Sequence, residues 1–159
     1  MDQFTILPHL LALSVAYALA FPIAWDREKE SRSAGLRTFP LVALAACGFV
    51  QATEGFAASN PEAMARIIAG LITGVGFVGG GAIIKHGSSV RGTATAASLW
   101  ATGAMGAAVG LRNYYDVAIM ISAFTFVTLR FLRVFKVGDQ PDFKMGDQPD
   151  DPESRRQSR

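Results

Sequence analysis

FTILPHLLALSVAYALAFPIAW, residues 4–25, contains no Asp, Glu, Lys or Arg. A second stretch, IIAGLITGVGFVGGGAII at residues 67–84, is equally free of charged side chains. Both have the length that a helix needs to cross the ~30 Å hydrocarbon core of a bilayer. The first is not typical of a cleaved secretory signal, because no Lys or Arg precedes it and it continues past Ala18-Leu19-Ala20 to Trp25. The sequence therefore predicts an integral membrane protein.

The apolar segments predict an all-α bundle of five transmembrane helices. They cover roughly residues 4–25, 39–58, 61–84, 94–111 and 116–135. The third has a clear start, with Asn60 as N-cap, Pro61 at the first helical position and Glu62 in the first turn. Asp116 is the expected N-cap of the fifth. Residues 1–136 thus form one membrane domain.

Basic residues predict the orientation of the five helices. Only Arg66 and Arg112 lie on the side that carries the N-terminus. The other side carries Arg27, Lys29, Arg32, Arg37, Lys85, Arg91, Arg130, Arg133 and Lys136. By the positive-inside rule this second side is cytoplasmic, so we expect the N-terminus outside and the C-terminus inside.

Residues 137–159 have a different composition. The pentapeptide GDQPD occurs at 138–142 and again at 146–150, and large apolar side chains are nearly absent. A segment of this kind cannot bury a core. We expect a disordered polar cytoplasmic tail.

The glycines of the third helix have two readings. Small residues four apart let membrane helices approach closely, as Gly70 with Gly74 and Gly76 with Gly80 would. We expect Gly70 and Gly74 to serve packing within the bundle. Three consecutive glycines, 79–81, exceed what one packing face can use, so we also expect an irregular helix end there.

A few polar residues lie near or within the membrane. Asp26 and Arg91 share the cytoplasmic side and are expected to pair, because a charge near membrane depth needs a partner. Gln51 and Glu54 share one face of the second helix, where Glu54 lies either at the outer interface or against Arg66. Side chains spaced to hold a metal are absent from the sequence, so we expect no metal site.

Several of these residues fall in motifs that resemble the MgtC/SapB family of bacterial inner-membrane proteins. The motifs are GLRT at 35–38, LVALAAC at 41–47, GVGFVGGGAI at 74–83 and SVRGTATAASLW at 89–100. Asp26-Arg27-Glu28 is similar to the family's E-R-E at the end of its first helix. Phe39-Pro40 departs from the pattern, since members often have His after GLRT. The polar tail resembles the short, SapB-like members, which lack a soluble C-terminal domain.

The resemblance implies a multi-pass protein of the bacterial inner membrane, linked to magnesium limitation and, in pathogens, to virulence. It also implies a set of functional motif residues: Asp26, Arg27, Gly35, Arg37, Gly74, Gly76, Gly79, Arg91, Thr95, Ser98 and Trp100. Family regulation of the membrane ATP synthase makes that complex a candidate partner.

We therefore expect a regulatory protein that binds another membrane complex through its glycine and alanine faces. The alternative is a small-ion transporter or channel subunit for magnesium, with Asp26, Glu54 and Arg91 along the path. We expect no enzyme activity, no cofactor and no nucleic-acid partner, because no nucleophile, base or phosphate-binding spacing is present. The bilayer surrounds the helices, and homo-oligomers are compatible with the sequence.

Overall fold

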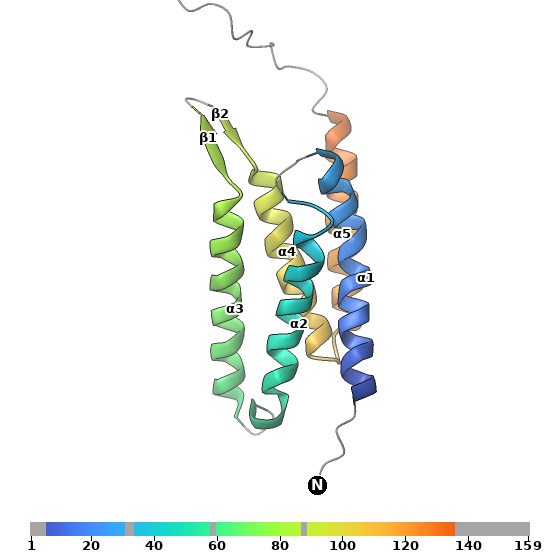
Figure 1. Cartoon of the computed structure of the whole chain (residues 1–159), viewed down its shortest axis with the longest axis vertical. Coiled ribbons are helices and arrows are strands. Elements are labelled where there is room, and N and C mark those ends of the chain that lie inside the picture. Colours follow the sequence, from blue (N-terminus) through green and yellow to red (C-terminus); the bar gives the residue numbers. More distant parts are fainter. Residues whose placement is uncertain (1–5, 31–33, 58–59, 87–88, 136–159) are drawn as a thin grey trace, which may run out of the picture.

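The computed structural model describes residues 6–30, 34–57, 60–86 and 89–135. The element order is α1 (Ile6–Glu30), α2 (Thr38–Ala57), α3 (Pro61–Gly81), β1 (Ile84–His86), β2 (Ser89–Arg91), α4 (Thr93–Gly110) and α5 (Tyr115–Phe135). The helices run along the long axis of the molecule, with α3 at one edge and α1 and α5 at the other (Figure 1). The expected all-α bundle is confirmed. The polar tail predicted over 137–159 lies outside the described residues.

α4 is the central helix and contacts each of the other four. It is rich in Ala, Gly, Ser and Thr, so its neighbours can approach its backbone closely. A Cβ added at Gly103 would lie 2.8 Å from Val75 Cγ2 of α3. One added at Gly106 would collide with the backbone carbonyl of Ala43 in α2. The glycines of α4 therefore set the separation between the helices on both sides.

α1 packs through a stripe of alanines spaced four residues apart, and the stripe is completely buried. Its members are Ala12, Ala16, Ala20 and Ala24. The first three share a core cluster with Cys47 of α2, Met105 of α4 and Ala118 of α5. Ser122 Oγ of α5 donates to the Leu19 carbonyl of α1 at 2.7 Å, which adds an interhelical hydrogen bond beside that core.

Two helix ends differ from the predicted ones. α1 continues to Glu30, because Glu, Lys and Arg are good helix formers, and Asp26 and Arg27 therefore belong to the helix. α5 begins at Tyr115, so Asp116 lies in its first turn and the predicted N-cap is wrong. The predicted cap of α3 is confirmed: Asn60 Oδ1 accepts the Ala63 N–H at 3.1 Å.

Among the helices that the structure describes, two are long and apolar enough to cross a membrane by length and composition, namely α1 and α3. Both correspond to the uncharged stretches of the sequence. α3 is the less enclosed of the two, since it lies at the edge of the bundle and few of its residues are buried.

Candidate functional site

A buried ion pair lies near the end of α1. Arg27 Nη2 donates to Asp26 Oδ2 at 2.7 Å, and the two residues are 5% and 3% exposed. Each charge compensates the other, which is what permits burial. Arg27 Nε is buried without a hydrogen-bond partner among the described residues. The predicted pair of Asp26 with Arg91 is wrong, because Asp26 binds its neighbour in sequence and Arg91 is exposed.

The connection from α1 to α2 is folded back onto the last turn of α1. Glu28 Oε2 accepts the Leu36 N–H at 2.9 Å. A Cβ added at Gly35 would collide with Glu28, so this close approach requires glycine. Arg37 follows, exposed, immediately before the first residue of α2.

The glycines at the end of α3 lead into a small antiparallel β-ladder. The Ala82 N–H donates to the Gly79 carbonyl at 3.0 Å, a three-residue spacing that tightens the last turn. β1 and β2 then pair with Ile84 opposite Arg91. Gly92 closes the ladder at φ +88°, where a Cβ would also collide with the Ala82 carbonyl. The expected irregular end of α3 is confirmed, and it carries Arg91 outward from the bundle.

Two hydroxyl residues of the motif at 89–100, Thr95 and Ser98, are buried in α4, as is Thr102 beyond it. Ser98 Oγ donates to the Ala94 carbonyl at 2.6 Å, and Thr102 Oγ1 donates to the Ser98 carbonyl at 2.8 Å. Thr95 is buried, at 2% exposure. Trp100 differs from these, since it is 50% exposed.

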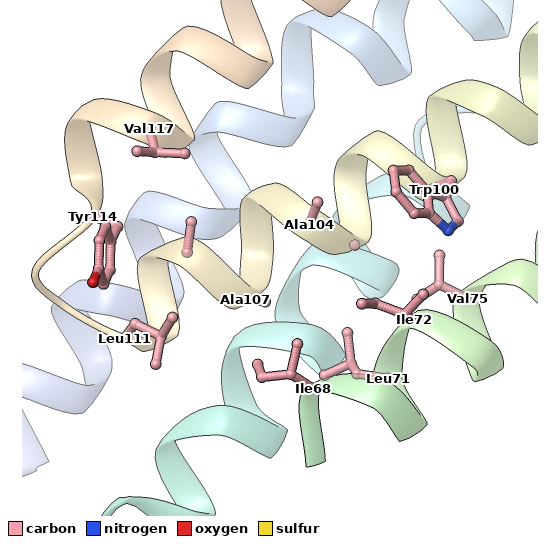
Figure 2. A pocket seen from close by; sticks show the side chains of 12 residues that line it. Ile68, Leu71, Ile72, Val75, Trp100, Ala104, Ala107, Leu111, Tyr114 and Val117 are labelled. Atoms are coloured by element: carbon pink, nitrogen blue, oxygen red, sulfur yellow. The ribbon is translucent and has the colours of Figure 1, made fainter. Parts of the chain in front are cut away.

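Trp100 lines a groove of about 370 Å³ between α3 and α4. Ile72 and Val75 project toward it from α3, while Leu111 and Tyr114 lie toward the far end of α4 (Figure 2). The lining is aliphatic and aromatic. Trp100 therefore faces an apolar groove that it shares with side chains of α3.

The glycines of α3 behave differently from those of α4. A Cβ added at Gly70, Gly74, Gly76 or Gly80 would have nothing within 4 Å. Among the α3 glycines only Gly79 has a close neighbour, since a Cβ added there would lie 3.2 Å from the Ala96 carbonyl oxygen. The prediction that Gly70 and Gly74 serve packing inside the bundle is wrong, because α3 meets its neighbours through larger residues such as Leu71 and Val75.

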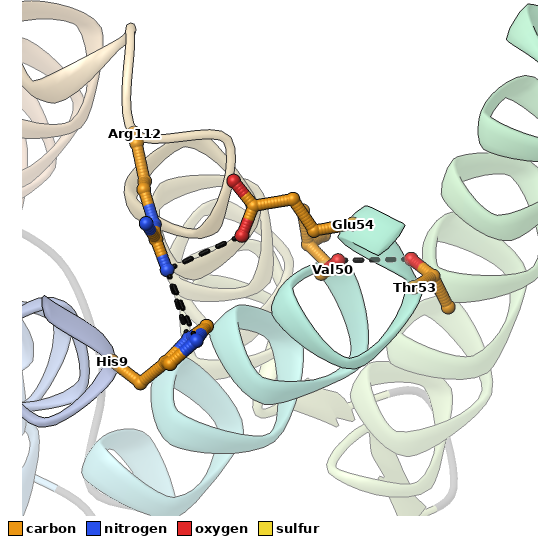
Figure 3. A network of polar contacts seen from close by, with 5 residues as sticks. All are labelled: His9, Val50, Thr53, Glu54 and Arg112. Atoms are coloured by element: carbon orange, nitrogen blue, oxygen red, sulfur yellow. Dashed lines mark hydrogen bonds and ion pairs between the residues drawn. The ribbon is translucent and has the colours of Figure 1, made fainter. Parts of the chain in front are cut away.

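A second polar cluster joins three segments at the other end of the bundle (Figure 3). Arg112 Nη2 lies 3.2 Å from Glu54 Oε2 of α2 and 2.9 Å from His9 Nδ1 of α1. Arg112 follows α4 and adopts φ 59°, a left-handed conformation that disfavours a non-glycine residue. The cost is compensated by contacts that hold the α4–α5 turn against α1 and α2. Glu54 thus binds Arg112 and not Arg66, one of the contacts open to it if it faced the bundle interior.

Sequence reasoning missed this cluster because nothing in the spacing links its members. His9 and Arg112 are 103 residues apart. The one available signal is Arg112 itself, a charge in the short connection between two apolar helices. Gln51, one turn before Glu54, is 8% exposed, and its Nε2 has no partner among the described residues.

Within the described segments no group of three or more His, Cys, Asp or Glu side chains is arranged to hold a metal ion. The candidate site has three parts. Two are arginine–carboxylate clusters at opposite ends of the bundle, Asp26 with Arg27 and Glu54 with Arg112, and the third is the exposed side of α3.

Residues 13–137 match the sequence model of the MgtC family. This chain belongs to the MgtC family. It is similar to protein MgtC of Salmonella typhimurium, with 35% identity over 113 residues, which is 71% of this chain and 48% of the relative. It is 36% identical over 135 residues to the uncharacterised protein slr0014 of Synechocystis, covering 83% of this chain and 56% of the relative.

Protein MgtC of Brucella abortus is 40% identical over 98 residues, 62% of this chain and 40% of the relative. The chain spans about half the length of the curated relatives it matches. No solved structure matches it.

The region matched to the MgtC family contains all the motif residues named above. The structure brings Asp26 together with Arg27, and it places Gly35 against Glu28. It does not gather the remaining members into one pocket. Arg91 and Trp100 are exposed on the hairpin and α4, whereas Thr95 and Ser98 are buried in α4.

Proposed function

We propose that this MgtC-family chain crosses the bacterial inner membrane five times, with the N-terminus outside and the C-terminus in the cytoplasm. Large apolar side chains on the outside of the bundle support this placement, including Phe49 of α2, Phe77 of α3 and Phe124 of α5 at 64%, 86% and 70% exposure. A bilayer favours such a surface and water does not. Exposed Arg37 and Lys85, at the predicted cytoplasmic end, agree with the positive-inside rule.

Within that membrane the chain acts as a regulator that binds another membrane complex, without a catalytic step. A cation pathway would use two carboxylates, and both are paired with arginines. This observation favours a regulator over a transporter. Asp26 is bound by Arg27 at 2.7 Å, and Glu54 is bound by Arg112 at 3.2 Å. Magnesium requires carboxylates and water in its coordination shell, and a carboxylate compensated by a guanidinium is a poor ligand.

The partner-binding surface is the outward side of α3, which we call the partner face: Ala69, Gly76 and Gly80. All three are exposed, and neither glycine has an atom within 4 Å of an added Cβ. Small residues at such spacing let a second membrane helix approach closely. Because of the family resemblance, we propose the membrane ATP synthase as the partner and magnesium limitation as the condition.

The test uses the full chain in cells lacking their own copy, grown in low magnesium. Gly76→Leu places a large side chain on the partner face, and Ala123→Leu places the same one on an exposed position of α5. We expect Gly76→Leu to lose both growth complementation and copurification of ATP synthase, and Ala123→Leu to keep both. Equal behaviour of the two variants would overturn the partner face.

Magnesium uptake into sealed liposomes separates the regulator from the transporter. We expect the wild-type protein, once shown to be inserted, to give no uptake above protein-free liposomes. Uptake above that control that falls in Glu54→Gln would replace the regulator with a magnesium transporter, and would place Glu54 on the path.

A further inference from the structure

A second groove lies between α2 and α3, and it shares Leu71 and Val75 of α3 with the groove in Figure 2. Its volume is about 450 Å³, within the range of ligand pockets. Its walls are Phe49 and small residues of α2 on one side and Gly70 and Gly74 of α3 on the other. The glycines leave this space open, because an added Cβ at either position would have nothing within 4 Å.

The chemistry of the groove selects a hydrocarbon. Thr53 is the one lining residue with a polar side chain, and its hydroxyl donates to the Val50 carbonyl of its own helix at 2.9 Å. That hydrogen bond is drawn in Figure 3. The lining therefore offers no charge and no free hydrogen-bond donor, and the methyl and methylene groups that make up the rest of it favour an apolar chain.

The length of the groove matches one membrane leaflet. Its lining in α2 runs from Val42 to Thr53, which at 1.5 Å per residue is roughly 16 Å. Half of the hydrocarbon core of a bilayer is about 15 Å.

Cationic side chains lie at the end of the molecule where this groove begins. Arg37 immediately precedes α2, and Lys85 lies on the strand that continues from α3. Both are exposed, and neither makes an ion pair with another described residue. Figure 1 shows the β-ladder and the start of α2 toward the same end of the bundle.

We propose that the α2–α3 groove binds an acyl chain of an anionic phospholipid from the cytoplasmic leaflet, whose phosphate lies near Arg37 and Lys85. The groove accommodates the acyl chain, and the two cationic side chains favour a negatively charged headgroup. This inference rests on the membrane placement proposed above, but not on the partner face or on ATP synthase.

The test is native mass spectrometry of the delipidated full chain in a mild detergent, titrated with dioleoyl phosphatidylglycerol or dioleoyl phosphatidylcholine. We expect one phosphatidylglycerol per chain, bound more tightly than phosphatidylcholine by roughly fivefold for each cation that faces the phosphate. Arg37→Gln should reduce this preference about fivefold. Lys29→Gln, the matched control, should leave it unchanged because Lys29 lies over the Trp25 ring at 4.9 Å.

Gly74→Leu fills the groove, and it should weaken phosphatidylglycerol binding by roughly five- to 150-fold, the range expected for overpacking. Gly76→Leu makes the same change on the partner face, and should leave lipid binding unchanged. Both substitutions replace glycine with a better helix former at positions without close neighbours, so both variants are expected to fold. Ala45→Leu fills the groove from α2 and should reproduce the loss.

Equal binding by the wild type, Gly74→Leu and Ala45→Leu would overturn the groove as the site. Equal affinity for the two lipids would overturn the headgroup contact. A dimer that only Gly74→Leu dissociates would assign the groove to a second copy instead. Flotation with vesicles tests the membrane placement separately, since a chain that floats but retains no phosphatidylglycerol overturns the lipid site alone.

Discussion

Replacing Gly106 with alanine tests whether close contact between α4 and α2 sets the stability of the bundle. A Cβ at this position would lie 3.0 Å from both the carbonyl carbon and the Cα of Ala43, and closer still to its carbonyl oxygen. Ordinary contact between carbon atoms begins at about 3.5 Å, and because the carbonyl oxygen is closer than the two carbons, the two helices must separate by more than roughly 0.5 Å. Because the obstructing atoms are backbone, no side-chain rotation can relieve the contact.

The cost follows from overpacking, which is typically about 1–3 kcal/mol. The better helix propensity of alanine offsets up to about 1 kcal/mol of this. A net loss of about 1–2 kcal/mol corresponds to a melting temperature lower by roughly 2–8 °C for a chain of this size. Gly76→Ala is the matched control, since its Cβ would have no neighbour within 4 Å.

The assay is thermal unfolding of the two purified variants and the wild type in one detergent, followed by size-exclusion recovery. Gly76→Ala should melt at the wild-type temperature or up to about 4 °C above it. If Gly106→Ala melts at or above the wild-type temperature, the α4–α2 contact does not limit stability and the reasoning fails.

Three further predictions concern the charged residues. Arg27→Gln leaves a buried carboxylate uncompensated and should lower the free energy of unfolding by about 3–5 kcal/mol, seen as loss of monodisperse protein. Lys29→Gln should leave the yield unchanged, and equal yields of the two variants would contradict the buried pair. His9→Phe removes the hydrogen-bond acceptor of Arg112 Nη2 and should lower the free energy of unfolding by about 0.5–1.5 kcal/mol in melting curves, whereas His9→Gln, which keeps an acceptor, should lower it less. An unchanged melting temperature in His9→Phe would contradict a stabilising contact. Arg91→Ala should leave the melting temperature unchanged, since Arg91 is exposed. The same variant should nevertheless impair growth in low magnesium more than Lys29→Ala does. Equal growth of the two variants would show that Arg91 is not a functional residue.

The helices could be predicted from the sequence because long uncharged segments and the Asn60-Pro61 cap are local signals. The α1 alanine stripe is also visible in the sequence, because small residues four apart indicate a packing face. Side-chain partners could not be predicted in the same way. Asp26 has several arginines on its own predicted side of the membrane, and only the three-dimensional structure shows that Arg27 is the one that binds it.

The glycines also show that contacts between helices cannot be predicted from residue spacing alone. Spacing alone gives Gly70 and Gly74 the same meaning as Gly106 and Gly110, because both pairs are four residues apart. The α4 pair lies against the backbone of α2, whereas the α3 pair faces open space. The difference depends on which helix occupies the centre of the bundle, and this is a property of the whole assembly of helices.

The contact between His9 and Arg112 also has a consequence for biogenesis. The two residues are 103 positions apart, so at about 5–20 residues per second the ribosome needs roughly 5–20 s to supply the second after the first. In the proposed membrane placement, α1 lies in the bilayer throughout that interval without its polar partner. The His9–Arg112 contact therefore forms late in synthesis. It can form only when the turn after α4 lies on the same side of the membrane as the start of the chain. A nascent chain inserted with that turn on the wrong side has no means of making the contact.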